Sequence, residues 1–422
     1  MDSGGDEIML CQFIVKNFKS FRDEVVLDMQ AVGLSEHKDS LIVDGDGEAF
    51  VPVAAIYGPN GGGKSNIIEA LVALKYKIMK PICSVCEHND CGGKERKMPL
   101  VPFLLDPKSK NKPIEFTLFF RTKKAEYRYV LHVLKEDVIF ETLDKKNING
   151  TRYTSLFERV NNAVTLNGTF KKLQAPADIS DTITTISYLA ITHKRHGIVK
   201  DVVRWFESGI TIDNFGNPFF ESRIAIPSDP QSIKFVVEML SEMDIDVSGL
   251  RTEQVDEDDF EVYFEHTING KKFELPVDAE SSGTKKILGF LPDIYQSLAH
   301  GTVLCVDEMD SKLHPILMKY IVGLYTSRDV NKNGAQLIFT SHDLANMNNE
   351  VYRRDEIWFV AKNNEQVSNL YSLVELRDSD GKGVRKDAKY AKRYLEGKYG
   401  ADPFLRQIIN WGEIYGKELE TC

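Results

Sequence analysis

Residues 53–66, VAAIYGPNGGGKSN, decide the fold of this chain of 422 residues. An apolar run, 51–57, precedes the glycines, and SNIIEALVALKYKIM (65–79) places apolar residues at helical spacing after them. Gly58 to Ser65 match G-x-x-x-x-G-K-[ST], the phosphate-binding loop, in the strand-then-helix context that this motif requires. Backbone N–H groups of such a loop, together with the helix N-terminus, bind phosphate oxygens. The motif therefore predicts a nucleotide site.

Each residue of this loop has an expected role. Lys64 would neutralise phosphate charge during the reaction, and the hydroxyl of Ser65 would bind Mg²⁺. The alternative, a glycine turn that merely links a strand to a helix, is disfavoured by the context of the motif. The candidate nucleotide-binding residues of this segment are Gly58, Pro59, Asn60, Gly61, Gly62, Gly63, Lys64, Ser65 and Asn66.

Composition excludes several classes of protein. With 42% apolar and 27% charged residues, the chain is expected to form two or three globular lobes. No apolar run reaches the roughly 18 residues of a membrane span, and the first ten residues lack the features of a signal peptide, so a cytoplasmic protein is expected. A net charge of −10 confines any contact with nucleic acid to a local basic patch. Six cysteines do not make a disulfide scaffold.

The remaining sequence patterns predict an α/β protein. Residues 13–29 read as a strand, a turn and a strand, and 114–141 alternate as in an antiparallel meander. Between about 180 and 250 the periodicity is helical. Asn269-Gly270 lies between two alternating runs and favours a type I′ hairpin turn. TVLCVDE (302–308) and AQLIFTSH (335–342) resemble buried strands of a parallel sheet.

Three segments follow from these patterns. We expect an N-terminal lobe with the phosphate loop in 1–80, and the rest of an antiparallel β-lobe with a mainly helical insert in 81–279. Residues 280–422 would form a C-terminal ATPase lobe, which carries the further candidate residues described next. The insert would sense a trigger or hold a partner.

Further candidate residues follow the two apolar strands. Asp307 and Glu308 end the first strand, where parallel sheets place their ligands. Asp307 would hold Mg²⁺, and Glu308 would polarise the attacking water. His342 ends the second strand, where an imidazole would hydrogen-bond a γ-phosphate. A solvated carboxylate pair and a core histidine are the alternatives.

Residues 280–286, ESSGTKK, complete an ordered set of motifs. Phosphate loop, Ser-Gly motif, Asp-Glu pair, Asp310 and His342 occur in the order that resembles ABC-class ATPases of the SMC and RecF type. The resemblance implies a head-to-tail homodimer in which Ser282 and Gly283 of one subunit cap the γ-phosphate bound to the other. It also implies that Asp310 is the D-loop residue and His342 the switch histidine. A helix N-terminus suits an anion, although an ordinary helix cap is the alternative.

Softer patterns resemble the RloA/AbiL-like group of bacterial ABC-class ATPases of phage-defence systems. The resemblance implies control of a separately encoded effector, a nuclease or Toprim-like protein, in abortive infection. One departure is that no convincing Q-loop glutamine lies between the phosphate loop and the Ser-Gly motif. The stretches that carry the resemblance span nearly the whole chain and include FKSF (18–21), YGPNGGGKSN (57–66), PFLLDP (102–107), VDEMDSKLHP (306–315), FTSHD (339–343), DEIWFV (355–360) and YLEGKYGADPF (394–404).

A second candidate site is the segment KPICSVCEHNDCGGK (80–94). Its Cys83, Cys86, His88 and Cys91 offer a ligand set that suits Zn²⁺. One short loop closes a tetrahedron with difficulty, so a site completed by another chain and a set of reduced thiols are alternatives. A third, weaker set of carboxylates, Glu375, Asp378 and Asp380 in VELRDSDGKG (374–383), resembles those of a Toprim nuclease but more simply forms a solvated loop.

Two rival functions remain open at this stage. A RecF-like DNA-binding ATPase in DNA repair would need a basic groove, which steep salt dependence of binding would reveal. A P-loop kinase would give a phosphorylated product without net hydrolysis, and the Ser-Gly motif disfavours it. The basic clusters that would serve DNA are Lys194, Arg195 and Lys200, and Lys386, Lys389, Lys392 and Arg393.

Overall fold

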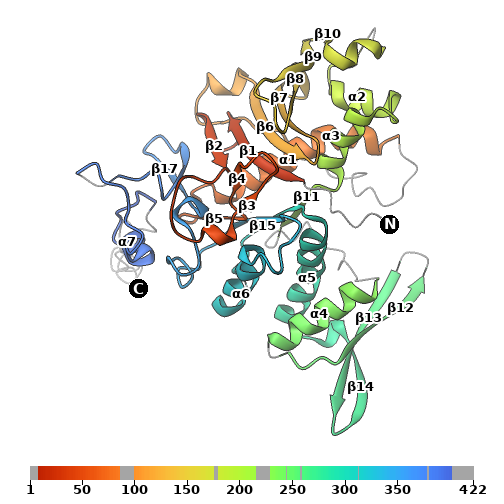
Figure 1. Ribbon diagram of the computed structural model, residues 1–422, viewed down its shortest axis with the longest axis vertical. Coiled ribbons are helices and arrows are strands. Elements are labelled where there is room, and N and C mark those ends of the chain that lie inside the picture. Colours follow the sequence, from red (N-terminus) through yellow and green to blue (C-terminus); the bar gives the residue numbers. More distant parts are fainter. Residues whose placement is uncertain are drawn as a thin grey trace, which may run out of the picture.

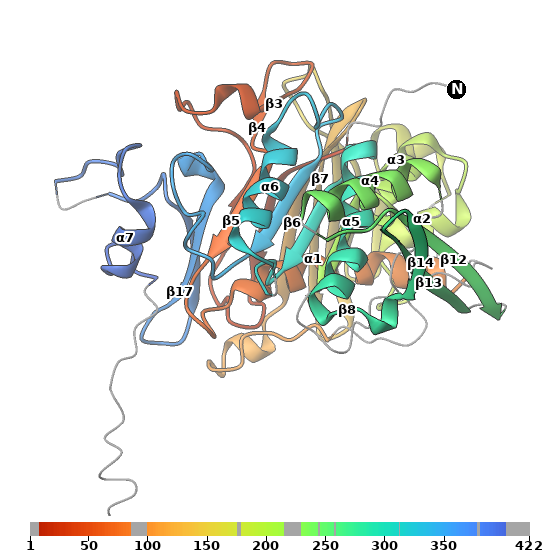
Figure 2. The ribbon, with the colours of Figure 1, turned by 90° about the horizontal axis from the view of Figure 1, so that it is seen from below.

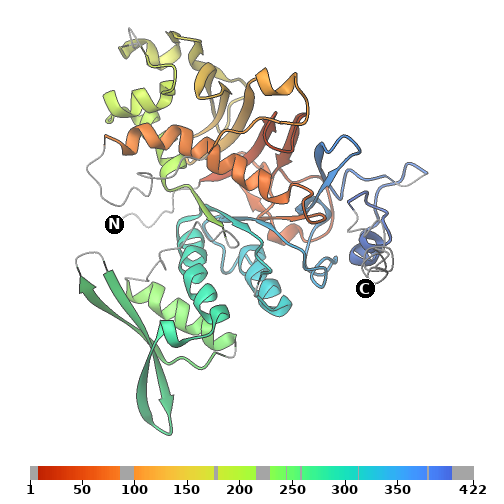
Figure 3. The ribbon, with the colours of Figure 1, turned by 180° about the vertical axis from the view of Figure 1, so that it is seen from behind.

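A computed structural model describes residues 8–85, 99–174, 179–214, 229–243, 245–256, 259–311, 313–377 and 380–401. Two large sheets share one apolar core around the long helix α1 (Lys64–Cys83), as Figures 1 and 3 show. The phosphate-loop motif immediately precedes this helix, so the core of the protein holds the motif in place.

The first sheet is antiparallel and has seven strands in the order β10-β9-β8-β7-β6-β1-β2. Strands β6 to β8 form the predicted meander, and β1 and β2 form the predicted N-terminal hairpin. Their buried and exposed residues alternate, because one face packs on the core. The strands are β1 (Met9–Lys16), β2 (Val25–Asp28), β6 (Ile114–Thr122), β7 (Ala125–Leu134), β8 (Asp137–Asn147), β9 (Thr154–Val160) and β10 (Ala163–Leu166).

The second sheet has six strands in the order β11-β15-β16-β5-β17-β18, and only β18 is antiparallel to its neighbour. The carboxyl ends of its parallel strands share one edge, where open α/β sheets place their ligands. The strands are β5 (Val53–Tyr57), β11 (Ile210–Asn214), β15 (Val303–Asp307), β16 (Gln336–Thr340), β17 (Ile357–Lys362) and β18 (Ser368–Ser372).

Both faces of the parallel sheet are covered. In the fully buried strand β5, Ala54 and Ile56 belong to the core around α1, whereas Val53, Ala55 and Tyr57 belong to a second core. The second core contains α5 (Ser282–His300) and α6 (Pro315–Thr326), which Figure 2 shows in front of the parallel strands. Burial on both faces explains the continuous apolar runs of these strands.

In the described residues of the segment expected to be helical, between about 180 and 250, there are three helices, α2 (Thr185–Thr192), α3 (Gly197–Glu207) and α4 (Pro230–Glu242). The same segment also contains β11, a strand that the periodicity did not reveal. Glu141, fully buried on β8, accepts hydrogen bonds from the backbone N–H groups of Thr185 (2.6 Å) and Ile186 (3.1 Å), and so anchors α2 to the antiparallel sheet.

A small three-stranded sheet lies beside α4 at one end of the molecule (Figure 1). Asn269 and Gly270 at its tip have φ of 51° and 78°, as the predicted type I′ turn requires. The predicted α/β class, with an antiparallel β-lobe and a mainly helical insert, is therefore confirmed. The remaining elements are β12 (Gly249–Asp256), β13 (Asp259–Ile268), β14 (Lys271–Pro276), the pair β3 (Ile42–Val43) and β4 (Ala49–Phe50), and α7 (Tyr390–Leu395).

Candidate functional site

The phosphate-loop motif connects β5 to α1 along a path that only glycine can follow. Gly61 and Gly63 have φ of 71° and 108°, in the left-handed region that favours glycine. Gly58, with φ of 157°, packs so closely on β17 that a Cβ would lie 2.2 Å from the carbonyl oxygen of Val360. The glycines of the motif are therefore demanded by the backbone, and they leave a cradle of peptide groups at the carboxyl edge of the sheet.

Lys64 is the first residue of α1 and is only 6% exposed. Its Nζ donates hydrogen bonds to the carbonyl oxygens of Gly58 (2.9 Å) and Pro59 (3.2 Å). Burial lowers the pKa of Lys64 to about 8, and the nearby carboxylates of segment 307–310 oppose this effect. A phosphate group would give the ammonium an anionic partner in addition to these neutral carbonyls.

The hydroxyl of Thr340 organises the Asp-Glu pair. Thr340 is fully buried at the end of β16, and its Oγ1 donates to Asp307 Oδ1 (2.6 Å) while accepting from the backbone N–H of Glu308 (2.7 Å). Glu308 has φ of 50°, a left-handed conformation that costs a non-glycine residue about 1–3 kcal/mol. The two hydrogen bonds to Thr340 help to hold this strained turn, which directs the two adjacent carboxylates.

Asp310 joins this turn to His342. The backbone N–H of His342 donates to Asp310 Oδ2 (3.0 Å). Among the described residues, the buried Oδ1 of Asp310 has no hydrogen-bond partner. Burial and, to a lesser degree, the charge of Lys64 lower the pKa of His342, against the opposing effect of the carboxylates. The imidazole is therefore neutral near pH 7 and can donate one hydrogen bond and accept another.

The Ser-Gly motif forms the first turn of α5. Ser281 caps the helix, its Oγ accepting from the backbone N–H of Thr284 (3.1 Å). Among the described residues, a Cβ on Gly283 would meet only Ser281 Oγ, at 3.7 Å. The backbone of Ser282 begins the helix, and its side chain lies outside the described part of the structure. The first N–H groups of a helix have no acceptor within it, so this open turn can bind an anion.

The residues present fit a nucleoside triphosphate with a divalent cation. The cradle at Gly58 is closed to any side chain, and the Lys64 ammonium rests on neutral carbonyls. The unpartnered Oδ1 of Asp310 is a further free acceptor beside it. Hydroxyl and carboxylate oxygens such as those of Ser65 and Asp307 are ligands that Mg²⁺ prefers.

The structure brings most of the predicted residues to one edge of the parallel sheet. Lys64 and His342 each lie within electrostatic reach of all three carboxylates in 307–310. The sequence reasoning missed Thr340, although its position at the end of an apolar strand, just before the candidate histidine, was a usable signal. It also missed Ser20 and Ser368, which contact the phosphate loop.

The candidate zinc ligands are mostly beyond what the structure describes. Cys83 is half-buried at the end of α1, whereas Cys86, His88 and Cys91 lie outside the described residues. In the described ranges no group of three metal-ligating side chains comes together. The zinc site stays a prediction.

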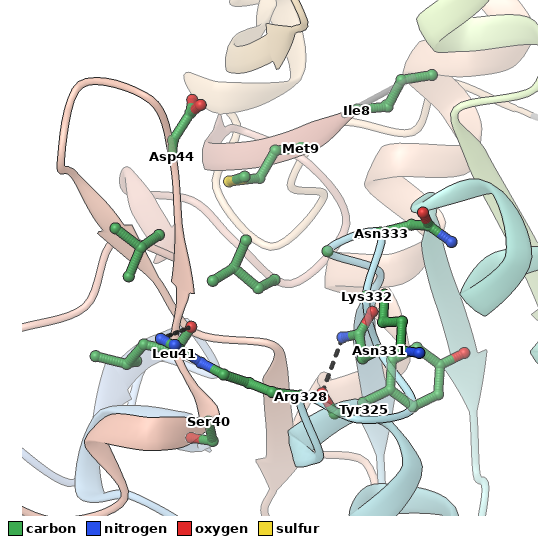
Figure 4. Close-up of a pocket in the computed structure, with 13 residues that line it drawn as sticks. Ile8, Met9, Ser40, Leu41, Asp44, Tyr325, Arg328, Asn331, Lys332 and Asn333 are labelled. Carbon is green, nitrogen blue, oxygen red and sulfur yellow. Dashed lines mark hydrogen bonds between the residues drawn. The ribbon is translucent and has the colours of Figure 1, made fainter. Parts of the chain in front are cut away.

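A cavity of about 320 Å³ lies near the edge of the parallel sheet from which β16 begins, opposite the edge that carries the phosphate loop (Figure 4). Ile8 and Met9 line it at the start of β1, and Asn333 and Gly334 line it just before β16. It is therefore separate from the phosphate loop. No helix in the described part of the chain has the length and apolarity of a membrane span.

Comparisons with known proteins give one family match and several matches to solved structures. A family model described as "AAA domain, putative AbiEii toxin, Type IV TA system" matches residues 53–348, from β5 to just beyond His342. The comparison with curated proteins gave no match. Solved structures that match this chain include the SMC head domain from Thermotoga maritima, 16% identical with a TM-score of 0.39, covering 87% of this chain and 99% of that one. Another is the Smc head domain bound to the C-terminal domain of ScpA, derived from Pyrococcus furiosus, 13% identical with a TM-score of 0.39, covering 87% and 96%.

Proposed function

We propose that this chain, which belongs to that AAA domain family, is an ABC-type ATPase, that two copies close around ATP and that hydrolysis reopens them. The observation that carries the proposal is the pairing of a complete phosphate site with an open Ser-Gly turn. One edge of the parallel sheet carries Lys64, Asp307, Glu308 and His342. In the described part of the chain, a Cβ on Gly283 would meet no atom but Ser281 Oγ. A second copy would place its own bound nucleotide against this turn.

The residues of one copy would bind the nucleotide and prepare the reaction. The loop N–H groups and Lys64 hold the phosphates, and Ser65 and Asp307 hold Mg²⁺, which supplies neutralisation of the phosphate charge. Glu308 accepts a proton from the attacking water, a contribution typically worth 10²–10⁴-fold in rate. Thr340 keeps the Glu308 turn in position, and the neutral imidazole of His342 hydrogen-bonds the γ-phosphate.

The second copy would complete the site. The first turn of its α5, with Ser282 and Gly283, caps the γ-phosphate through backbone N–H groups. Closure and γ-phosphate recognition are then linked equilibria, because ATP stabilises the closed dimer only through contacts that ADP lacks.

We further propose that closure controls an effector in anti-phage defence. The description of the matching family names a toxin and a type IV toxin–antitoxin system, and this supports a defence role, which we place in the cytoplasm. The narrower RloA/AbiL-like resemblance points to a separately encoded nuclease or Toprim-like effector. The three-stranded sheet β12–β14 beside α4, which leads directly into the Ser-Gly turn, is a suitable surface for this effector.

A DNA-binding role is the second candidate, favoured by one observation. Lys386, Lys389 and Lys392 are all exposed on and just before α7, in a protein whose net charge is −10. Affinity for duplex DNA that falls steeply with salt would support this role.

Phosphate release from ATP tests the proposed activity. We expect Mg²⁺-dependent hydrolysis by the wild type and its loss in Lys64→Ala, which cannot neutralise the phosphates. Glu308→Gln should bind ATP but release phosphate at least 100-fold more slowly, as removal of a general base predicts. Unchanged turnover in Glu308→Gln would remove this residue from its role.

A further inference from the structure

Two serines outside the phosphate-loop motif pack directly on it. Ser20 lies in the turn after β1, and Ser368 begins β18, so they come from different sheets. The fully buried Oγ of Ser368 lies 2.6 Å from the carbonyl oxygen of Gly62 and 2.7 Å from Ser20 Oγ. Asn66 Nδ2 donates to Ser20 Oγ at 2.6 Å. The four groups form one connected chain of hydrogen bonds.

Two donors serve this group of atoms. The Ser368 hydroxyl is placed to donate both to the carbonyl oxygen of Gly62 and to Ser20 Oγ, so its one proton is shared between these two acceptors. Ser20 Oγ also accepts from the amide of Asn66. Gly62 belongs to the phosphate-loop motif and Asn66 directly follows the motif on α1, so the two serines brace the loop from both sides of Lys64.

Backbone contacts and sterics fix the brace in place. The N–H of Ser368 donates to the carbonyl of Ser20 (2.8 Å), and an exposed ion pair joins Arg22 to Glu365 in the same two segments. A Cβ on Gly63 would lie 2.6 Å from both serine hydroxyls. The two hydroxyls thus pack against the loop at Gly63, and the loop cannot move toward them without a steric clash.

The brace acts on a peptide group that matters for phosphate. In a planar trans peptide the carbonyl of Gly62 and the N–H of Gly63 point in opposite directions. Fixing the carbonyl toward Ser368 therefore fixes the N–H of Gly63 away from it, on the open side of the loop. Loop N–H groups are what binds phosphate oxygens in such motifs.

We propose that Ser20 and Ser368 are positioning residues for the nucleotide, bracing the phosphate loop through these connected hydrogen bonds. The inference rests on the proposed function, because a braced loop matters only if the loop binds phosphate. Ser20 follows a strand of the antiparallel sheet, and Ser368 begins a strand of the other sheet. A shift of one sheet relative to the other would therefore move the two serines apart and alter the phosphate loop.

Equilibrium binding of a slowly hydrolysed ATP analogue tests the brace. Ser20→Ala and Ser368→Ala should each weaken affinity about tenfold, equivalent to ~1.4 kcal/mol, and the double variant should be no weaker than the worse single one. Ser20→Thr, which keeps the hydroxyl, should bind like the wild type. Ser372→Ala is the matched control, because Ser372 is a buried serine of the same strand whose hydroxyl contacts Arg354 and Ile357 carbonyls instead.

Thermal melting of each variant separates a positioning role from a purely structural one. The brace predicts weaker binding in Ser20→Ala and Ser368→Ala than in Ser372→Ala at comparable melting temperatures. Affinities within twofold of the wild type, additive losses in the double variant, or an equal loss in Ser372→Ala would overturn it. Nucleotide binding by the wild type and by Lys64→Ala distinguishes failure of the brace from failure of the proposed nucleotide site. If the wild type binds and Lys64→Ala does not, the nucleotide site stands whatever the serine variants do. If the wild type does not bind, both proposals fail.

Discussion

The substitution Gly283→Ala should weaken the ATP-dependent dimer without lowering the free energy of unfolding of a single copy. Gly283 lies in the first turn of α5, and of the atoms that the structure describes an added Cβ would meet only Ser281 Oγ, at 3.7 Å. Alanine is favoured over glycine in a helix by up to about 1 kcal/mol, and the gain is smaller near the end of a helix. The free energy of unfolding of a single copy should therefore stay the same or rise slightly.

The same methyl group should weaken the closed dimer. In the proposed dimer the backbone N–H groups of this turn approach the γ-phosphate bound to the other copy, and a Cβ stands where the phosphate must come. Losing one hydrogen bond to a charged group costs about 1.5–3 kcal/mol, which is roughly 10- to 150-fold in affinity for each nucleotide. Binding of ATP to a single copy should not change, because Gly283 of that copy does not touch its own phosphate loop in the proposal.

Three measurements on Gly283→Ala check these expectations together. Thermal melting reports the stability of the copy, ATP-analogue binding reports the phosphate loop, and ATP-dependent mass reports closure. We expect an unchanged or raised melting temperature, unchanged binding and a weakened dimer. A variant that dimerises and hydrolyses ATP like the wild type would refute the role of this turn as a cap.

Three further predictions concern the site itself. Thr340→Val should lower turnover at least tenfold, since it removes the hydroxyl that joins Asp307 to the Glu308 turn, and Thr340→Ser should restore it; equal turnover in the Val and Ser variants would contradict this. Burial lowers the pKa of Lys64 to about 8, so the Lys64 ammonium of the nucleotide-free protein is lost as pH rises through about 8. Calorimetry should therefore show weaker ATP binding above that pH, and proton uptake on binding near it. An ATP affinity that is constant from pH about 7 to about 9 would exclude the effect. Gly58→Ala should abolish nucleotide binding, because its Cβ would collide with the carbonyl of Val360; retained affinity in direct binding would show that the loop can relax.

The sequence sufficed for parts of the fold that depend on local patterns. The phosphate loop, the meander of 114–141 and the turn at Asn269-Gly270 follow from glycine positions and from alternation, which act over a few residues. The helices between 185 and 242 follow from their apolar periodicity. Strand β11 did not, because five residues paired with one neighbouring strand carry too short a pattern to reveal it.

The site residues that belong to one sequence motif could be predicted. Those that contact the site from distant parts of the sequence could not. Lys64 and Asp307 could be named from their motifs, whereas the contact of Ser368 with Gly62 joins residues 306 positions apart. A single serine in a strand has no pattern that sets it apart from other strand serines. The strain at Glu308 also required backbone angles that no sequence pattern specifies.

The mass of Glu308→Gln in solution, measured by light scattering with and without ATP and Mg²⁺, tests the central claim most directly. The variant keeps the groups that bind ATP but lacks the base that would reopen the dimer. We predict an ATP-dependent doubling of mass, or a larger multiple, that ADP does not produce and that Gly283→Ala suppresses. An unchanged mass under all conditions would contradict closure of two copies around ATP.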